Sequence, residues 1–390
     1  MAYDDSKPVI PMEEYPLRWA RARELMASCS LDLLVAYADD HAVFGPAWAR
    51  YFANFTVHFE PCIILLPLEG EPVLLVGPEC PTYAALHSPV RDIRVLKEFT
   101  HPDEDYPFAK LYPFREILDS LNLKNINKIG VCGKHLMSYD LFSELTVSSK
   151  AQWTDVESLF LTLRYIKSNA EIAVIRYAYQ IAEKGLLAAI DAVKPGISER
   201  EIAAEAEYVM RKMGAEGLGI DTFAASGKNA GPIIARTTFR KIEKDDFIFF
   251  TIAPRYEGYH GAVGVPVILG KVNEDIRKAC CAAKEAHELC ASALKAGMDC
   301  KAEQMGRDHM GKFNLDKHFL YSGIHSIGVI EFEAPIFGPS CREKMDKNMI
   351  LSIDIPVFDA PWGGLRIENG YLITESGAES LANFPFVAEK

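Results

Sequence analysis

Two apolar, strand-like segments near the C-terminus each carry an acid in their interior, and this pattern constrains the fold more than any other feature of the sequence. The segments are residues 351–356 (LSIDIP) and 363–374 (GGLRIENGYLIT), which contain Asp354 and Glu368. A buried ionised carboxylate is costly unless it meets a cation, a metal ion or several hydrogen-bond donors. Both acids therefore need partners, and an ion pair with Arg366 or a position at a sheet edge is the simplest structural explanation.

A histidine precedes these two acids in residues 321–335 (YSGIHSIGVIEFEAP). If the three segments lie side by side in one sheet, His325, Asp354 and Glu368 converge. A lone histidine on a strand is more often a core residue than a catalyst. Two neighbouring carboxylates, however, would fix its tautomer and adjust its pKa toward neutrality, as acid–base catalysis requires. We therefore predict that His325 is catalytic, assisted by Glu368 and Asp354.

Length, charge and cysteine content limit the class of protein. The chain has 390 residues, 49% of them hydrophobic, which is enough for two domains with separate cores. Its net charge is −12 and its basic residues are scattered, so we expect neither nucleic acid nor membrane as a partner. No apolar run approaches the length of a membrane span, and the N-terminus lacks a signal core. Nine cysteines without a CxxC pair indicate reduced thiols and a cytoplasmic protein.

The order of helix and strand signals predicts two domains. Residues 1–160 alternate between helical and strand-like patterns, and residues 68–71 (LEGE) read as the turn of a hairpin. From residue 161 onward the pattern changes to long helices, the second of which begins with a capping box at Ser198 and Glu201. We expect an α/β domain over residues 1–160. Over residues 161–390 we expect a curved antiparallel sheet backed by helices, with the site on its concave face.

The second half of the chain resembles the creatinase/aminopeptidase P family, also called the pita-bread or peptidase M24-like family. The resemblance covers residues 165–386 and rests on IKSNAEIAVIRYA, VKPGISEREIAAEAE, SGKNAG, GIHSIGVIEFEAP and GGLRIENGYLITESGAE, which occur in family order and spacing. The first domain is similar to the smaller N-terminal domain of that family. The resemblance implies an α+β protein with a C-terminal pita-bread fold and an N-terminal α/β creatinase-type domain.

Most members of this family are metallopeptidases with a dinuclear site. The resemblance places His325, Asp354 and Glu368 at three of the five ligand positions, but Thr251 and Ala262 stand where the family has two aspartates. Neither a hydroxyl nor a methyl group replaces a carboxylate that bridges two hard cations. We therefore expect no dinuclear metal site.

Creatinase is the metal-free branch of the family, and the C-terminal GAESLANFPF is most similar to it. The resemblance then implies a metal-independent, creatinase-like hydrolase or lyase that acts on a C–N or similar bond of a small zwitterionic metabolite, without a cofactor. Creatinase's own reaction is not implied, because Ile234, Gly264 and Phe332 stand at three of its active-site positions.

Several further residues are candidates for substrate binding. The resemblance to creatinase aligns Arg342 with the creatinase arginine that binds the carboxylate of the substrate. Glu331 and Glu333 alternate with Phe332 and are expected to share one face, with solvent exposure as the alternative. Surface exposure is the simplest expectation for His260. The resemblance also implies a homodimer in which the N-terminal domain of one subunit closes the cleft of the other. The full set of candidates is Arg342, Phe332, Glu331, Glu333, Tyr256, Tyr259, His260 and His58.

Two alternative functions remain open. The first is an Xaa-Pro dipeptidase or aminopeptidase whose degenerate site binds a single metal ion through His325, Asp354 and Glu368. The second is a non-catalytic pita-bread binding protein, which the family residues lost at Thr251, Ala262, Ile234 and Phe332 favour. The retained polar residues on apolar strands oppose this second alternative, because each is costly inside a cavity unless its hydrogen bonds are satisfied.

Overall fold

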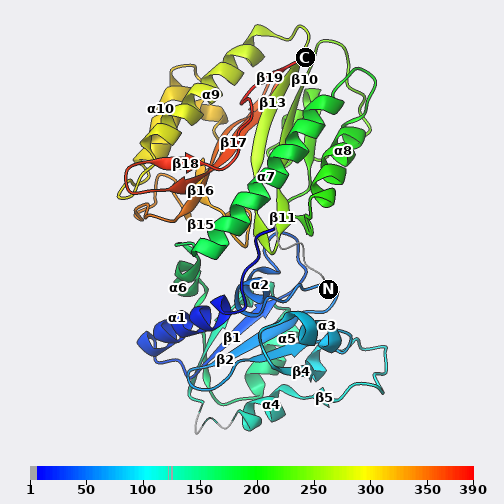
Figure 1. Cartoon of the computed structure of the whole chain (residues 1–390), viewed down its shortest axis with the longest axis vertical. Helices are drawn as coiled ribbons and strands as arrows, with labels where there is room; N and C mark the ends of the chain where they lie inside the picture. Colours follow the sequence, from blue (N-terminus) through cyan, green and yellow to red (C-terminus); the bar gives the residue numbers. More distant parts are fainter. Residues whose placement is uncertain (1–6, 122, 124–125) are drawn as a thin grey trace. The chain divides into compact units, whose positions relative to one another are not determined.

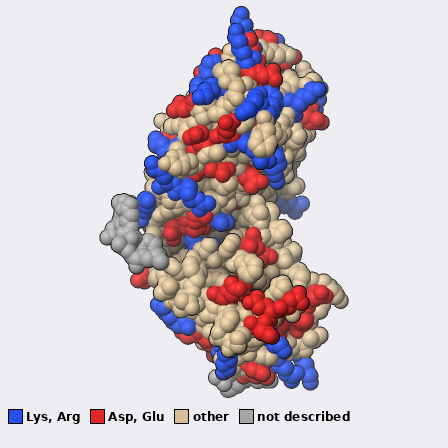
Figure 2. Space-filling view, turned by 90° about the vertical axis from the view of Figure 1, so that its right-hand side faces the viewer, with Lys and Arg blue, Asp and Glu red and all other residues tan. Residues whose placement is uncertain are grey.

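The computed structural model describes residues 7–121, 123 and 126–390, and the chain forms two compact units. One unit is Pro11–Arg164, and the other is Tyr165–Lys390 together with the short N-terminal segment that ends at Ile10. Within the described residues, no helix has the length and apolar character needed to cross a membrane. Basic side chains are interspersed with acidic ones over the face shown in Figure 2, and this agrees with the scattered charges of the sequence.

The Pro11–Arg164 unit is built on a seven-stranded sheet with the order β5-β4-β3-β2-β1-β6-β7 among the described residues. The hairpin predicted around residues 68–71 is confirmed, because β2 and β3 pair in antiparallel fashion. The remaining pairs, apart from β1–β2, are parallel. The strands are β1 Leu33–Ala38, β2 Cys62–Pro67, β3 Val73–Val76, β4 Asp92–Leu96, β5 Leu111–Tyr112, β6 Lys128–Cys132 and β7 Gln152–Asp155. The α-helices are α1 Glu14–Ser28, α2 Ala47–Ala53, α3 Pro81–His87, α4 Phe114–Ser120, α5 Tyr139–Val147 and α6 Glu157–Phe160.

Four long helices belong to the second unit: α7 Asn169–Ala192, α8 Glu199–Lys212, α9 Glu274–Ala293 and α10 Lys301–Gly311. The capping box predicted for α8 is confirmed, since the Ser198 hydroxyl accepts a hydrogen bond from the Glu201 amide and the Glu201 carboxylate accepts one from the Ser198 amide. Helix α7 begins with the same motif at Ser168 and Glu171. Figure 1 shows α7 beside α8 and α9 beside α10.

These helices pack on a curved, mostly antiparallel sheet of nine strands. Its main path runs β15-β14-β16-β17-β13-β10-β9, while β18 pairs with β17 and β19 pairs with β13. The strands are β9 Phe223–Ser226, β10 Asp246–Ile252, β13 Val263–Leu269, β14 Ile324–Ser326, β15 Glu333–Ile336, β16 Ile350–Ala360, β17 Gly363–Ile373, β18 Ala378–Ser380 and β19 Ala388–Glu389. A separate three-stranded sheet contains β8 Gly217–Leu218, β11 Pro254–Tyr256 and β12 Tyr259–His260.

The alternation of residues along β16 and β17 determines which side chains reach the site. Leu351, Ile353 and Ile355 of β16 belong to the same buried apolar cluster as residues of α9 and α10. Successive side chains of a strand point to opposite faces, so Ser352 and Asp354 point away from this cluster. The two acids of the sequence pattern are thus on the face that α9 and α10 leave uncovered. This two-domain pita-bread architecture confirms the predicted fold class.

Candidate active site

Three neighbouring strands bring the predicted catalytic residues together. His325 of β14 is directly opposite Ser352 of β16, and Asp354 of β16 is directly opposite Glu368 of β17. Residues opposite one another in an antiparallel pair project to the same face. The predicted convergence of His325, Asp354 and Glu368 in one sheet is therefore observed, and Gly264 of β13 continues the row beyond Glu368.

The imidazole of His325 is held in one orientation. Its Nδ1 lies 2.9 Å from the carbonyl oxygen of Ser326, to which it donates as Nδ1–H, and its Nε2 is 4.0 Å from Oε1 of Glu368. The Phe332 ring lies against it, with ring centroids 4.3 Å apart. Burial lowers the pKa of His325 to about 4, although its hydrogen bond to Ser326 opposes this. At neutral pH the ring is thus uncharged and presents the Nε2 lone pair to the acids.

Glu331 joins this group from the irregular segment between β14 and β15. The ligand atoms of His325, Glu331 and Glu368 all lie within 4.8 Å of one another. The segment is anchored at Gly328, whose carbonyl oxygen accepts hydrogen bonds from both the amide and Nδ1 of His260, each at 3.0 Å. Glu331 is only 6% exposed, so the alternative of a solvent-exposed acid is wrong.

Glu333 has a different interaction partner from Glu331, although the two residues are separated only by Phe332. Its Oε1 accepts a hydrogen bond of 2.8 Å from the Lys167 ammonium, and both side chains are 1% exposed. The Ser326 hydroxyl lies 3.5 Å from the same ammonium. The two acids, which were predicted to share one face, therefore have different partners: Glu333 forms a buried ion pair, whereas Glu331 approaches His325 and Glu368.

Asp354 is occupied by protein partners. The Tyr321 hydroxyl donates to its Oδ2 at 2.9 Å, and the Arg366 Nε lies 3.3 Å from its Oδ1. The same guanidinium is 4.0 Å from Oε2 of Glu368 through Nη1. Ser352 supports Glu368 from the other side, because its hydroxyl donates to Oε1 at 2.9 Å. Arg366 and Tyr321 thus engage Asp354 most closely, while Glu368 lies 4.0 Å from both Arg366 and His325.

The charges of this cluster do not balance when all its acids are ionised. Arg366 is the one basic side chain of the described residues that forms ion pairs with Asp354 and Glu368, and His325 is neutral. Burial raises the pKa of Glu331 to about 7 and holds the pKa of Glu368 well above its usual range, with the neighbouring acids adding to the shift at Glu368. The site therefore requires a proton or a further cation near Glu331 and Glu368.

Three of these residues, His325, Glu331 and Glu368, could hold one divalent metal ion. An imidazole nitrogen with a free lone pair and two carboxylates form a suitable donor set for Zn²⁺, Mn²⁺ or Fe²⁺. On the other side of Glu368, Thr251 presents a buried hydroxyl that has no hydrogen-bond partner among the described residues, and Ala262 presents a methyl group. Neither side chain offers a carboxylate, and the absence of a second metal ion stays a prediction.

The other predicted residues are distributed around this centre. His260 is 1% exposed, so the expectation of surface exposure is wrong, because its ring is enclosed beside Gly219 and Glu331. The Tyr256 hydroxyl donates to the Pro8 carbonyl at 3.0 Å, and the Tyr259 hydroxyl donates to Oε1 of Glu171 at 2.8 Å.

Two predicted residues are exposed. Arg342 lies in the irregular segment between β15 and β16, and His58 precedes β2 in the other unit. Neither forms an ion pair with another residue in the described part of the chain, and their roles stay predictions.

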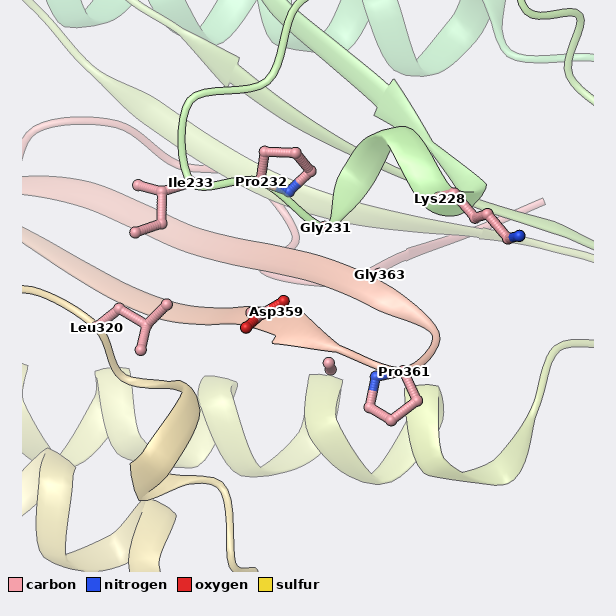
Figure 3. Close-up of a pocket in the computed structure, with 9 residues that line it drawn as sticks. Lys228, Gly231, Pro232, Ile233, Leu320, Asp359, Pro361 and Gly363 are labelled. Carbon is pink, nitrogen blue, oxygen red and sulfur yellow. The ribbon is translucent and has the colours of Figure 1, made fainter.

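A surface hollow of 510 Å³ near the turn between β16 and β17 is separate from the acidic cluster. Figure 3 shows the Asp359 carboxylate between Leu320 and the 231–233 loop, while the Lys228 side chain points away from it. None of His325, Glu331 and Glu368 lines this hollow.

Sequence reasoning did not assign Tyr321 and Ser352 to the site, and it treated Arg366 only as a structural ion-pair partner. Ser352 was recognisable in principle, since it stands two residues before Asp354 and therefore on the same face of β16. Tyr321 gave no such signal, because it precedes β14 in a turn.

Comparisons with known proteins agree with this architecture. Residues 173–375 match the family described as metallopeptidase family M24, and residues 18–166 match the creatinase/prolidase N-terminal domain. The Xaa-Pro dipeptidase of Pyrococcus furiosus is 29% identical over 358 residues, which cover 90% of this chain and 97% of that protein. The structure of the prolidase from Pyrococcus furiosus has a TM-score of 0.79 at 26% identity and covers 93% of this chain and 99% of that one. An Xaa-Pro dipeptidase from Bacillus anthracis shares the fold, with a TM-score of 0.82 at 22% identity over 97% of this chain and 100% of that one.

These comparisons correct the functional prediction. A metal-independent, creatinase-like hydrolase or lyase was expected from the substitutions at Thr251 and Ala262 and from the C-terminal resemblance to creatinase. The matching family is one of metallopeptidases, and two relatives that match 90% and 81% of this chain are named Xaa-Pro dipeptidases. The metal-independent prediction is therefore wrong. The two absent carboxylates are the basis for expecting no dinuclear site, and they do not exclude a metal ion on the remaining ligands.

Proposed function

Because the chain belongs to metallopeptidase family M24, we propose that this peptidase hydrolyses small dipeptides of the Xaa-Pro type with one divalent metal ion. The observation that carries the proposal is the convergence of His325, Glu331 and Glu368, whose ligand atoms lie within 4.8 Å of one another. The relatives named Xaa-Pro dipeptidases supply the substrate class. The alternative anticipated from the sequence used Asp354 as the third ligand, and Glu331 is the better candidate because Tyr321 and Arg366 already engage Asp354.

Each residue of the centre has a role that follows from its contacts. A divalent ion supplies a Lewis acid for hydrolysis of the peptide bond. His325 contributes Nε2, because its Nδ1–H is committed to the Ser326 carbonyl. Ser352 orients Glu368 by donating to Oε1. The Phe332 ring covers one side of the imidazole and limits the access of water from that side.

Arg342 and the homodimer belong to the same proposal. Arg342 is the candidate for binding the carboxylate of the dipeptide. Because Arg342 is exposed, a bound dipeptide would have to shield its guanidinium from solvent. The homodimer, with the N-terminal unit of a second subunit over the cleft and His58 offered there, stays a prediction.

The substrate class is tested with a panel of dipeptides on protein that has been treated with chelator and reloaded with Mn²⁺. We expect turnover of Ala-Pro and Leu-Pro, weaker turnover of Ala-Ala, and no cleavage of a tetrapeptide with proline at its second position. Cleavage of the tetrapeptide but not of the dipeptides would reassign the protein to the aminopeptidases. No turnover of any peptide by the Mn²⁺-loaded protein would contradict the proposal.

The raised pKa of Glu331 predicts how the stability of the metal-free protein depends on pH. The folded protein keeps this proton up to a pKa of about 7, whereas the unfolded chain releases it near the ordinary value of 4.5. The folded state therefore binds more protons between these values, and the contribution of Glu331 to stability falls as pH rises through that window. The shift corresponds to roughly 3 kcal/mol if the group is fully coupled to folding.

A comparison with Glu331→Gln isolates this group, because glutamine resembles the protonated acid at every pH. Between pH 5 and pH 8, Tm of the metal-free wild type should fall relative to Tm of this variant, and saturating Mn²⁺ should reverse the fall for the wild type only. Glu375→Gln, at a surface pair with Lys347, is the matched control and should follow the wild type. Parallel curves for the wild type and Glu331→Gln would show that Glu331 is ionised normally in the folded protein.

A further inference from the structure

Tyr179 of α7 lies next to the acidic cluster, although its helix contributes none of the acids or the histidine of that cluster. Its side chain is completely buried, and its phenol ring occupies the space above Gly370 of β17. Any side chain at residue 370 would overlap the ring and its hydroxyl. The backbone of the helix also approaches Gly261 closely, since a Cβ added there would lie 2.6 Å from the Tyr179 amide nitrogen.

The two glycines place the phenol beside Glu368. Gly370 is two residues beyond Glu368 on the same face of β17, and it is directly opposite Ser352, whose hydroxyl donates to Glu368. The register of β13 with β17 is the single pair Gly264↔Glu368, so the ladder does not continue as far as Ala262 and Gly370. Tyr179 thus lies where the two strands have no pairing and where no carboxylate projects from Ala262.

The hydroxyl of Tyr179 is buried without a hydrogen-bond partner of normal geometry in the described part of the chain. Its neighbours are the Ala262 amide, the Ser352 hydroxyl and the Glu368 carboxyl group. A buried phenol normally satisfies its hydroxyl, because an unpaired polar group in the interior costs about 1–3 kcal/mol. Such a group beside a pair of ion-binding acids is typical of a support for a metal ligand rather than of simple packing.

We propose that Tyr179 is a positioning residue of this active site: its hydroxyl supports the Ser352–Glu368 hydrogen bond and thereby holds Glu368 in the orientation that binds the metal ion. The inference rests on the proposed function, because it assigns Tyr179 to the same ion site. Tyr179 reaches the ion through Ser352 and Glu368 and does not bind it directly. Gly370 is required because it is the residue that admits the phenol to this position.

The test measures the affinity of the chelator-treated protein for Mn²⁺ by isothermal titration calorimetry. Tyr179→Phe keeps the ring and removes only the hydroxyl, and we expect it to weaken Mn²⁺ binding about 10- to 100-fold, the usual effect of losing a group that supports a metal ligand. Tyr177→Phe is the matched control on the same helix, since its hydroxyl donates to the Met213 carbonyl outside the cluster. An unchanged dissociation constant for Tyr179→Phe would overturn the inference.

A double-mutant cycle on the metal-free protein separates this inference from the proposed function. Tm is measured for Tyr179→Phe, for Ser352→Ala and for the protein with both changes. If the hydroxyl supports Ser352, the combined loss is smaller than the sum of the two single losses. Failure of the wild type to bind Mn²⁺ would contradict the one-ion site. The double-mutant cycle would still test whether the hydroxyls of Tyr179 and Ser352 interact. Additive losses would show that the two hydroxyls do not interact, and they would overturn the positioning role.

Discussion

Replacing His325 with alanine should lower kcat/KM for an Xaa-Pro dipeptide by more than about 100-fold, because loss of a group that only supports a metal ligand already costs about 10- to 100-fold. The imidazole supplies the one nitrogen among His325, Glu331 and Glu368, and its Nδ1–H is fixed by the Ser326 carbonyl so that Nε2 faces the acids. The variant removes this nitrogen ligand, so the carboxylates of Glu331 and Glu368 alone would have to hold the ion. Steady-state kinetics in the presence of excess Mn²⁺ measure the effect.

The histidine control is His309→Ala on α10. Its partly buried imidazole pairs with Glu285 on the neighbouring helix, away from the acidic cluster, so activity should change by less than about threefold. Because His325 is buried, circular dichroism must show that the variant is folded, and added free imidazole should restore part of the activity by filling the space left by the side chain. Full activity of folded His325→Ala would exclude His325 from the chemistry.

The largest effect on stability is expected at the ion pair between Lys167 and Glu333. Both side chains are 1% exposed and their charged atoms are 2.8 Å apart, so Lys167→Met leaves a buried carboxylate without its cation. Breaking a buried pair in this way typically costs about 3–5 kcal/mol in the free energy of unfolding. The pair lies beneath the segment that carries Glu331, since the Glu333 carboxylate fills the space next to Gly328. Urea denaturation measures the loss.

The double change Lys167→Met with Glu333→Leu separates loss of the pair from loss of packing. It removes both charges, so it should recover most of the stability that the single change loses. Lys184→Met is the exposed control, because Lys184 pairs with Glu183 at the surface and should contribute no more than about 1 kcal/mol. Equal losses for the single and double changes would show that the charge interaction is unimportant at this position.

The arrangement of strands was predictable from the sequence, whereas the choice of ligands was not. Apolar residues around Asp354 and Glu368 predict two adjacent strands, and the register indeed places these acids opposite one another. The pattern does not tell whether an acid is free to bind an ion. Asp354 is engaged by Tyr321 and Arg366, which depends on a turn and on a long side chain that crosses the face of the sheet.

Glu331 shows why the sequence did not indicate the proposed metal site. It lies in an irregular segment, where the alternation that relates sequence to direction does not apply, so its contact with His325 and Glu368 could not be read from spacing. The prediction of metal independence was based on the two carboxylates lost at Thr251 and Ala262. It left out the carboxylate that Glu331 supplies from another segment of the chain. Tyr179 was missed for a related reason, because its contact with Gly370 joins a helix and a strand that are distant in sequence.

Titration of metal-free protein with Mn²⁺, followed by turnover of Ala-Pro at each step, tests the one-ion active site most directly. If His325, Glu331 and Glu368 hold a single catalytic ion, activity should be absent after chelation, rise in proportion to added Mn²⁺ and reach its plateau at one equivalent per chain. Activity that persists without metal, or that needs two equivalents before the plateau, would contradict a one-ion active site.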